Sequence, residues 1–372
     1  MGSFTQTLAR ALAARKHQVS VVGFYPRHRA GEENDEGVSI IRLPHAELAG
    51  TGFIINGSRL RGALRQLHSR TPINIIEGPE LSLAIIPEDF PAAKVIRMNG
   101  GHQFFAATLK AKPRRWRSWL ERRSFSRADH LCAVSHYVAE TTRGLLQLGD
   151  QPIEILPNPV DTSRFQPKLP EFEEDGLILF AGTVCEKKGV RQLVQAIPQI
   201  VAAAPNARLW IAGRDWHDPH TGESFIEKLR RMIPAELTDR IIFKGMVEHA
   251  QLPEMMAQAS VCVYPSHMEA MPLAWLEGLA MGKAVVASQT GPGPEAIEDG
   301  VSGLLCNPHD PGSIAEKIIL LLKDGDLRRR LKQQARQRAV NLFAVEALAS
   351  RNEEFYSRIS SQYRDRQGAP LT

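Results

Sequence analysis

The sequence predicts an α/β fold with two doubly wound halves, each a parallel sheet covered by helices. Three observations indicate this class. Apolar segments with strand periodicity alternate with segments of helical periodicity along almost the whole chain, as in parallel sheets with crossover helices. A proline-rich segment, residues 156–170, interrupts this alternation, which then starts again. The length of 372 residues suits two domains, each large enough to bury its own core.

The first half begins with a helical pattern in which Phe4, Leu8 and Leu12 share one face. Strands are predicted at residues 18–24, 39–43, 73–77, 94–98, 130–134 and 153–156, and helices at 58–68, 113–126 and 137–146. A doubly wound half normally starts with a central strand and a glycine-rich turn, and Met1-Gly2-Ser3 looks like the remnant of that turn. We therefore expect the first strand to be missing, and an upstream in-frame segment of roughly 10–20 residues to encode it.

The second half repeats the alternation. Strands are predicted at residues 177–181, 208–212, 241–244, 261–264, 284–287 and 303–305, and helices at 189–203, 223–232, 251–258, 311–324, 327–340 and 345–360. The expected division is an N-terminal domain over 1–156, a linker over 157–175, a C-terminal domain over 176–342, and a helix with a tail over 343–372 that packs back toward the N-terminal domain. Ligands of such sheets bind outside the carboxyl ends of the strands, so the two halves are expected to face each other across a cleft.

The composition and charge narrow the function classes. No apolar run reaches the roughly 18 residues that span a bilayer, and no export signal is visible, so we expect a cytoplasmic protein. The cysteines form no CxxC pair, and no metal site is predicted. Residues 94–127 contain ten Lys or Arg and one acidic residue, a pattern that attracts phosphates or an anionic membrane surface. No recognised motif supports nucleic acid as the partner.

Two carboxylates stand eight positions apart in a loop-to-helix junction. Glu269 is predicted on the loop, and Glu277 about one turn into the helix that follows. Such a junction directs backbone N–H groups and the positive helix end toward an anion, typically a phosphate. Ionised glutamates only accept hydrogen bonds, which suits the hydroxyls of a sugar or ribose. The pattern therefore indicates a nucleotide-sugar site. If the two acids are considered alone, the alternative is an ordinary helix on which Glu277 is exposed to solvent.

A series of motifs in order resembles the retaining glycosyltransferases of family 4, which have the GT-B fold. The pair of glutamates matches the family's E-x7-E motif, and Lys188 lies in a segment, residues 186–189, similar to its phosphate loop. The other matching segments are residues 155–161 with Phe165, 177–182, 209–213, 243–245 and 264–266. The resemblance implies transfer of a glycosyl unit with retention, from a UDP- or GDP-sugar to a saccharide or lipid-linked acceptor. It implies no metal and no further cofactor.

The resemblance also implies roles for individual residues on the donor side. Glu269 would hydrogen-bond the donor sugar and Glu277 the ribose, while Lys188 would offset the charge that grows on the leaving diphosphate. The remaining expected donor-binding residues are Gly182, Thr183, Ala270, Met271 and Leu273. The family usually has Arg where this chain has Thr183, and Lys187 is a nearby candidate to supply that charge. Pro272 stands where the family often has Gly and donates no N–H.

The acceptor side is expected near the end of the strand at residues 94–98. Arg97, Asn99, Gly100 and His102 resemble the family's Arg-x-His-Gly motif, although Asn99 occupies the usual His position and His102 follows three residues later. A histidine there would bond the donor sugar or a phosphate, or polarise an acceptor hydroxyl. The alternative is a loop histidine whose ring only forms hydrogen bonds with neighbouring groups of the protein.

The basic segment from Arg114 to Arg123 places Trp116, Trp119 and Leu120 on one helical face. We favour a core-packed amphipathic helix, and the alternative is contact with an anionic membrane. The two are compatible, because one face of the helix can pack in the core while the arginines contact lipid phosphates. Such contact would make the protein peripheral on the inner face of the membrane, where polysaccharide or glycolipid assembly takes place. Two other function classes remain: a nucleotide-sugar 2-epimerase, and a truncated or degenerate protein that binds a nucleotide or a partner without turnover.

Overall fold

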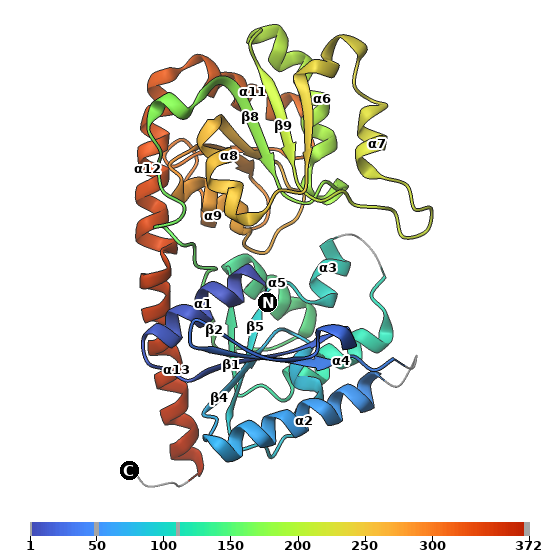
Figure 1. The fold of residues 1–372 in the computed structure, drawn as a ribbon, viewed down its shortest axis with the longest axis vertical. Coiled ribbons are helices and arrows are strands. Elements are labelled where there is room, and N and C mark those ends of the chain that lie inside the picture. The colour runs from blue at the N-terminus through green and yellow to red at the C-terminus, as the bar shows by residue number, and fades with distance from the viewer. Residues whose placement is uncertain (1, 48–51, 109–111, 368–372) are drawn as a thin grey trace. The chain divides into compact units, whose positions relative to one another are not determined.

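The computed structural model describes residues 2–47, 52–108 and 112–367 (Figure 1). The chain divides into two compact units. Unit 1 consists of Met1–Pro159 together with Val345–Thr372, and unit 2 is Val160–Ala344. Among the described residues no helix is long and apolar enough to cross a membrane.

The strands of unit 1 form two sheets. Three strands have the order β1-β3-β2, and four have the order β4-β5-β6-β7. Their bounds are β1 (Val19–Tyr25), β2 (Gly31–Asp35), β3 (Val38–Pro44), β4 (Ile75–Gly78), β5 (Ala93–Met98), β6 (His130–Ala133) and β7 (Ile153–Ile155). All neighbours are parallel except β2 and β3. Six of these strands match predicted ones within two residues at each end.

The described strands of unit 1 form two separate sheets, in which β1 and β4 are edge strands. In a doubly wound half the first strand is central, and here β1 and β4 each pair with a neighbour on one side only. No strand of the described residues lies between them. The sequence predicted one doubly wound half here, and the described residues form two smaller sheets instead.

Strand β2 was not predicted. Its sequence Gly31–Asp35 is polar and lacks the apolar alternation of a half-buried strand. It pairs with β3 through the two-residue turn Glu36-Gly37, where both residues have positive φ, 50° and 86°. The Gly37 N–H also donates to Asn34 Oδ1 at 3.0 Å. An acidic residue followed by Gly, here Glu36-Gly37, is typical of a hairpin turn. The prediction missed it because the strand before it lacks apolar alternation.

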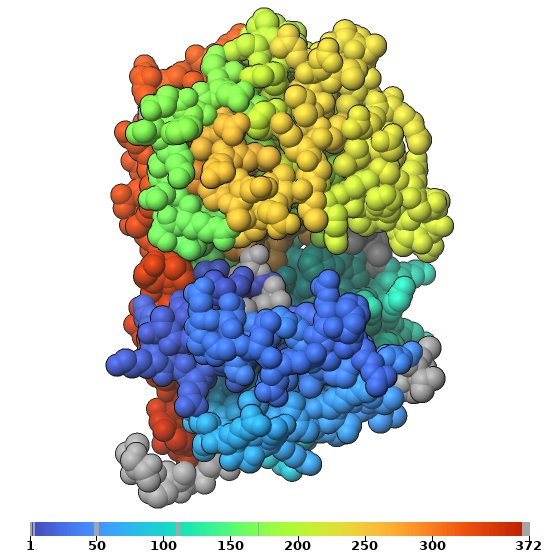
Figure 2. Space-filling model, viewed as in Figure 1, coloured from blue at the N-terminus to red at the C-terminus, as the bar shows by residue number. Residues whose placement is uncertain are grey.

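The helices of unit 1 include the C-terminal one. They are α1 (Ser3–Ala14), α2 (Gly52–Arg70), α3 (His102–Thr108), α4 (Arg115–Phe125), α5 (His136–Leu146) and α13 (Val345–Gln367). Phe355 and Ile359 of α13 are buried in one cluster with Val95, Cys132 and Leu156, so the last helix completes a core built by the first part of the chain. On the face shown in Figure 2, the N-terminal segments, drawn in blue, form most of the visible surface of unit 1.

Unit 2 is one doubly wound sheet with the order β10-β9-β8-β11-β12-β13, all parallel. The strands are β8 (Glu174–Ala181), β9 (Arg208–Ala212), β10 (Ile241–Gly245), β11 (Ala259–Tyr264), β12 (Ala284–Ser288) and β13 (Leu304–Cys306). The central strands are apolar on both faces, because helices cover both faces of the sheet. This is the predicted strand set.

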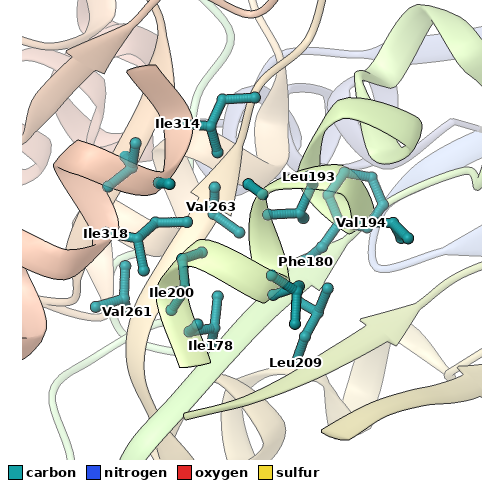
Figure 3. Close-up of a cluster of buried hydrophobic side chains, with 14 of the residues drawn as sticks. Ile178, Phe180, Leu193, Val194, Ile200, Leu209, Val261, Val263, Ile314 and Ile318 are labelled. Carbon is teal, nitrogen blue, oxygen red and sulfur yellow. The ribbon is translucent and has the colours of Figure 1, made fainter. Parts of the chain in front are cut away.

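The helices of unit 2 pack on this sheet. They are α6 (Val190–Ala203), α7 (Phe225–Arg230), α8 (Leu252–Gln258), α9 (Leu273–Ala280), α10 (Gly293–Ala296), α11 (Pro311–Lys323) and α12 (Gly325–Phe343). Figure 3 shows Leu193 and Ile200 of α6 and Ile314 of α11 meeting the side chains of β8 and β11. Asp324, the first residue of an Asp-x-Asp sequence, caps α12 by accepting the Leu327 N–H at 2.8 Å.

The chain enters and leaves unit 2 at one place. The Val160 N–H donates to the Phe343 carbonyl oxygen at 2.8 Å, and Val160 forms a parallel bridge with Ala344. The Arg336 guanidinium of α12 fixes this region further, since it donates to the carbonyl oxygens of Thr162, Phe165 and Ala280. The two connections to unit 1 are therefore neighbours in space.

Candidate active site

The donor half of the candidate site lies at the carboxyl ends of β8 and β11 in unit 2. The loop after β8 contains a short 3₁₀ turn, Glu186–Lys188, which ends at Gly189 with a φ of 68°. A Cβ at Gly189 would overlap the carbonyl oxygen of Pro265, so only glycine allows the two loops to approach. The His267 N–H donates to the Lys187 carbonyl oxygen at 2.8 Å and joins the loops directly.

This approach brings Lys188 and Glu269 together. The Lys188 ammonium forms an ion pair with Glu269 Oε1, although 81 positions separate the two residues. Both side chains are largely buried, with 21% of Lys188 and 12% of Glu269 exposed. The sequence predicted both residues for one site, and the structure places them in direct contact.

Glu277 lies on α9, as the spacing predicted, and its carboxylate is buried. Its Oε1 is 2.7 Å from His249 Nε2. The ring of His249 in turn packs near Phe165, with ring centroids 5.5 Å apart. One carboxylate oxygen is therefore held by the ring of His249.

The expected backbone donors lie at the start of α9. Ala270 and Met271 belong to the loop, Pro272 is the N-cap and Leu273 is the first helical residue. Pro272 contributes no N–H, so the orphan donors of this helix begin at Leu273.

Two titratable neighbours have altered pKa values. The hydrogen bond from Arg191 lowers the pKa of Glu186, so that this carboxylate stays charged beside the phosphate loop. Burial lowers the pKa of His267, with a further contribution from His309, whose ring lies 4.3 Å away. The loop that carries Glu269 therefore holds a neutral histidine at neutral pH.

Arg97 does not fit the predicted contact with an acceptor. Only 1% of Arg97 is exposed. Its guanidinium donates to Glu77 at 2.7 and 3.0 Å, to Asn352 Oδ1 at 2.6 Å and to the Tyr356 hydroxyl at 3.1 Å. Because every face of the group is occupied, Arg97 joins β5 to β4 and to α13, and the structure contradicts a direct acceptor role.

Asn99 and Gly100 lie in the loop between β5 and α3, and His102 is the first residue of α3. Gly100 has a φ of 91°, and a Cβ there would lie 3.0 Å from the rings of Phe104 and Phe105. The Arg114 N–H donates to His102 Nε2 at 2.9 Å, so the proton of the neutral ring is on Nδ1. The loop therefore presents Asn99 and the Nδ1 side of His102, whereas Nε2 is used internally.

Comparisons with known proteins identify the kind of enzyme. A family model described as Glycosyl transferases group 1 matches residues 161–338, and one described as Glycosyltransferase Family 4 matches residues 1–164. Together the two models cover residues 1–338, and they show the resemblance to the GT-B glycosyltransferases of family 4. The chain is therefore a glycosyltransferase, which the conjunction of Lys188, Glu269 and Glu277 in unit 2 had indicated.

Relatives of this transferase are distant in sequence. A glycogen synthase of Mycobacterium tuberculosis is 26% identical over all of the chain and 93% of the relative, and an alpha-maltose-1-phosphate synthase of Mycolicibacterium smegmatis is 27% identical over 66% of the chain and 67% of the relative. The sucrose-phosphate synthase of Thermosynechococcus elongatus has a similar structure, with a TM-score of 0.83 at 22% identity over 96% of the chain and 93% of that protein. These similarities place the transferase in the GT-B fold.

Two residues that lie beside the candidate donor residues were not predicted from the sequence. His249 holds Glu277 from a polar 3₁₀ turn, where a single histidine gives no signal. Arg214 follows β9, and the register of β8 and β9 explains its position. Ala181 pairs with Ala212 and Val184 with Asp215, so Thr183 lies opposite Arg214 on the neighbouring strand extension. No ion pair of Arg214 is present in the part of the chain that the structure describes.

The favoured prediction for the basic helix is wrong in part. Trp116 and Trp119 of α4 are 53% and 49% exposed, rather than packed in the core. Their rings stack with centroids 5.6 Å apart, and Phe53 of α2 contacts both. The buried face of α4 consists of Glu121, Ser124 and Phe125. We call Phe53, Trp116 and Trp119 the aromatic patch.

Proposed function

We propose that the transferase moves a sugar, with retention at C1, from a UDP- or GDP-sugar to a saccharide or lipid-linked acceptor. The observation that carries this proposal is the contact between Lys188 and Glu269 beside the buried Glu277. A cation suits a diphosphate, and two acceptor-only carboxylates suit sugar and ribose hydroxyls. The names of relatives support it: one solved structure, Anabaena HepE, similar with a TM-score of 0.74 at 14% identity, over 96% of each chain, was determined with UDP and glucose.

The reaction needs no group besides donor and acceptor. The bond between C1 and the diphosphate oxygen breaks, and the acceptor oxygen bonds to C1 from the same face. The acceptor proton passes to the leaving diphosphate, which ends as the nucleotide. Lys188 stabilises the charge that grows on this leaving group, and Glu269 holds the sugar hydroxyls so that C1 stays in place.

Arg214 supplies the charge that Thr183 lacks. The shared register places the two residues side by side at the carboxyl edge of the sheet, where neighbouring strands are about 4.8 Å apart. Residues opposite each other on parallel strands direct their side chains to the same face of the sheet. An arginine at 214 therefore reaches the region that an arginine at 183 would reach, and it competes with Lys187 as the compensating cation.

A thermal-shift panel tests the donor class. UDP, GDP, ADP and their sugars are added to the full chain, and the bound nucleotide raises Tm because it binds only the folded state. We expect one diphosphate nucleotide to raise Tm in the wild type and to lose most of this effect in Glu277→Ala. No shift with any nucleotide would overturn the proposal, and release of free sugar without transfer to any acceptor would restrict it to hydrolysis.

The acceptor is proposed to be presented at an anionic membrane surface on its cytoplasmic side. Half-exposed tryptophans suit the interface between headgroups and acyl chains, and Arg115 and Arg117 beside them are exposed. Arg123 lies over the Trp119 ring at 5.6 Å, which holds one cation against the aromatic patch. A lipid-linked acceptor would then meet the transferase where the lipid phosphates are.

A further inference from the structure

Two buried acids enclose the loop of residues 99–103 in unit 1. Glu80 comes from the segment after β4 and is 5% exposed, and Glu121 comes from α4 and is 1% exposed. A Cβ at Gly101 would overlap the Glu121 carboxylate and lie 3.0 Å from Glu80 Cγ. Gly101 therefore passes between the two carboxylates, and no side chain larger than hydrogen fits there.

The two carboxylates accept the backbone N–H groups of this loop. The Asn99 N–H donates to Glu80 Oε1 at 2.6 Å, and the Gly100 backbone also bonds to Glu80. The Gln103 N–H donates to Glu121 Oε2 at 3.0 Å, and the His102 backbone also bonds to Glu121. Four of the five residues of the loop are thus fixed through their backbone by two side chains from elsewhere in the unit.

Neither acid has a cation as its partner within the described residues. The basic groups around them are directed elsewhere: Arg97 on β5 binds Glu77, and on α4 and just after it Arg122, Arg123 and Arg127 donate to backbone carbonyl oxygens. The titratable groups that face the pair are His102 on α3 and Cys132 on β6. Burying two acids without a cation costs folding stability. The pair is therefore expected to serve a purpose other than stability.

We propose that Glu80 and Glu121 are positioning residues, which fix the backbone of residues 99–103 and so hold Asn99 and His102 in place for the acceptor. The link to the acceptor rests on the proposed function, whereas the control of the loop does not.

The two acids also make the loop sensitive to pH. Burial raises the pKa of Glu80 to about 7, and burial raises the pKa of Glu121 as well. The backbone N–H groups of Asn99 and Gly100 bond a charged carboxylate more strongly than a neutral acid, so ionisation of Glu80 tightens the loop.

Hydrogen exchange measures the loop directly and needs no substrate. In Glu80→Ala and Glu121→Ala the backbone donors lose their acceptors, and we expect the amides of residues 99–103 to exchange about tenfold faster or more. Glu80→Gln keeps the side-chain shape and one acceptor oxygen, and its loop should lie between wild type and Glu80→Ala. Glu77→Ala is the matched control, because it removes a neighbouring carboxylate that bonds Arg97 and does not touch the loop.

The wild-type chain provides a second measurement should an alanine variant fail to fold. After correction for intrinsic exchange, protection of residues 99–103 should rise as the pH rises through about 7, and Glu80→Gln should lack this step. Exchange in the alanine variants equal to wild type would overturn the positioning role, and a pH step of the same size in Glu80→Gln would overturn the pH sensitivity assigned to Glu80.

Kinetics then connect the loop to the acceptor. With the donor identified by the nucleotide panel, Glu121→Ala should raise the KM for the acceptor about tenfold and leave the donor KM unchanged. A loosened loop with both KM values unchanged would overturn the acceptor link. Nucleotide binding that fails in the wild type would instead overturn the proposed function, while the exchange result would still stand.

Discussion

At the scale of single residues, Lys188 and Glu269 form the contact on which the chemistry depends. We expect Lys188→Ala and Glu269→Ala each to lower kcat/KM by on the order of 100-fold, because one loses the cation facing the leaving group and the other the acceptor for sugar hydroxyls. Steady-state transfer measures this, with Lys228→Ala as a control for an exposed lysine of the same unit. Near-wild-type rates in both variants would remove the assignment.

Thr183 and Arg214 offer an exchange experiment. Arg214→Ala should weaken binding of the nucleotide diphosphate about tenfold or more, since a charge-assisted hydrogen bond is lost. Thr183→Arg in that background should restore the affinity by placing the charge on the neighbouring strand, whereas Thr183→Arg alone should add little. Isothermal titration measures each affinity. A loss in Lys187→Ala instead of Arg214→Ala would assign the role to Lys187.

The buried Glu80 has a consequence for stability. Its pKa in the folded chain is about 7, above the ordinary 4.5, so the folded state binds a proton that the unfolded chain has already released between these values. Its contribution therefore falls as the pH rises from about 4.5 to about 7, by up to about 3 kcal/mol. Urea denaturation should show Glu80→Gln gaining stability over wild type from about pH 5 to about pH 8. Glu140→Gln, an exposed acid on α5, should show no such trend.

At the scale of elements, α4 and the start of α2 carry the aromatic patch. We expect salt-sensitive binding to anionic vesicles, because attraction between exposed charges is screened over about 10 Å at 0.1 M salt. Replacing Trp116 and Trp119 together by Ala should weaken this binding about tenfold or more, as each ring loses its contact with the interface. Trp216→Ala in unit 2 is the control for an exposed tryptophan. Equal binding to neutral and anionic vesicles would contradict the proposal.

The elements themselves were predictable where periodicity is strong. The strands of unit 2 and Glu277 on a helix followed from apolar spacing and motif order, because helices on both faces of the sheet leave uninterrupted apolar strands. The polar β2 and the exposed tryptophans did not, since they depend on which neighbours the fold brings close. The same applies to the contact of His249 with Glu277 and of Glu80 with Asn99, for which composition and spacing give no signal.

At the scale of the whole molecule, unit 1 is assembled from both ends of the chain. Phe355 and Ile359 of α13 belong to the same buried cluster as Leu156, and Arg15 and His17 after α1 bond Glu353 of α13. Ending the chain after Ala344 should therefore destabilise unit 1 and leave unit 2 folded. Limited proteolysis of that shortened chain should release a stable fragment near Val160–Ala344. A stable fragment from the first 159 residues would contradict this expectation.

The adjacent connections at Val160 and Ala344 also set an order of assembly on the ribosome. Domains usually fold in the order in which they are synthesised. Here the first part of unit 1 emerges early but lacks the helix that covers Val95 and Cys132 until α13 has left the exit tunnel. Unit 2, encoded without interruption, is complete before then. The earlier-made half must wait with exposed apolar surface, so it is the half that a nascent-chain chaperone would be expected to hold.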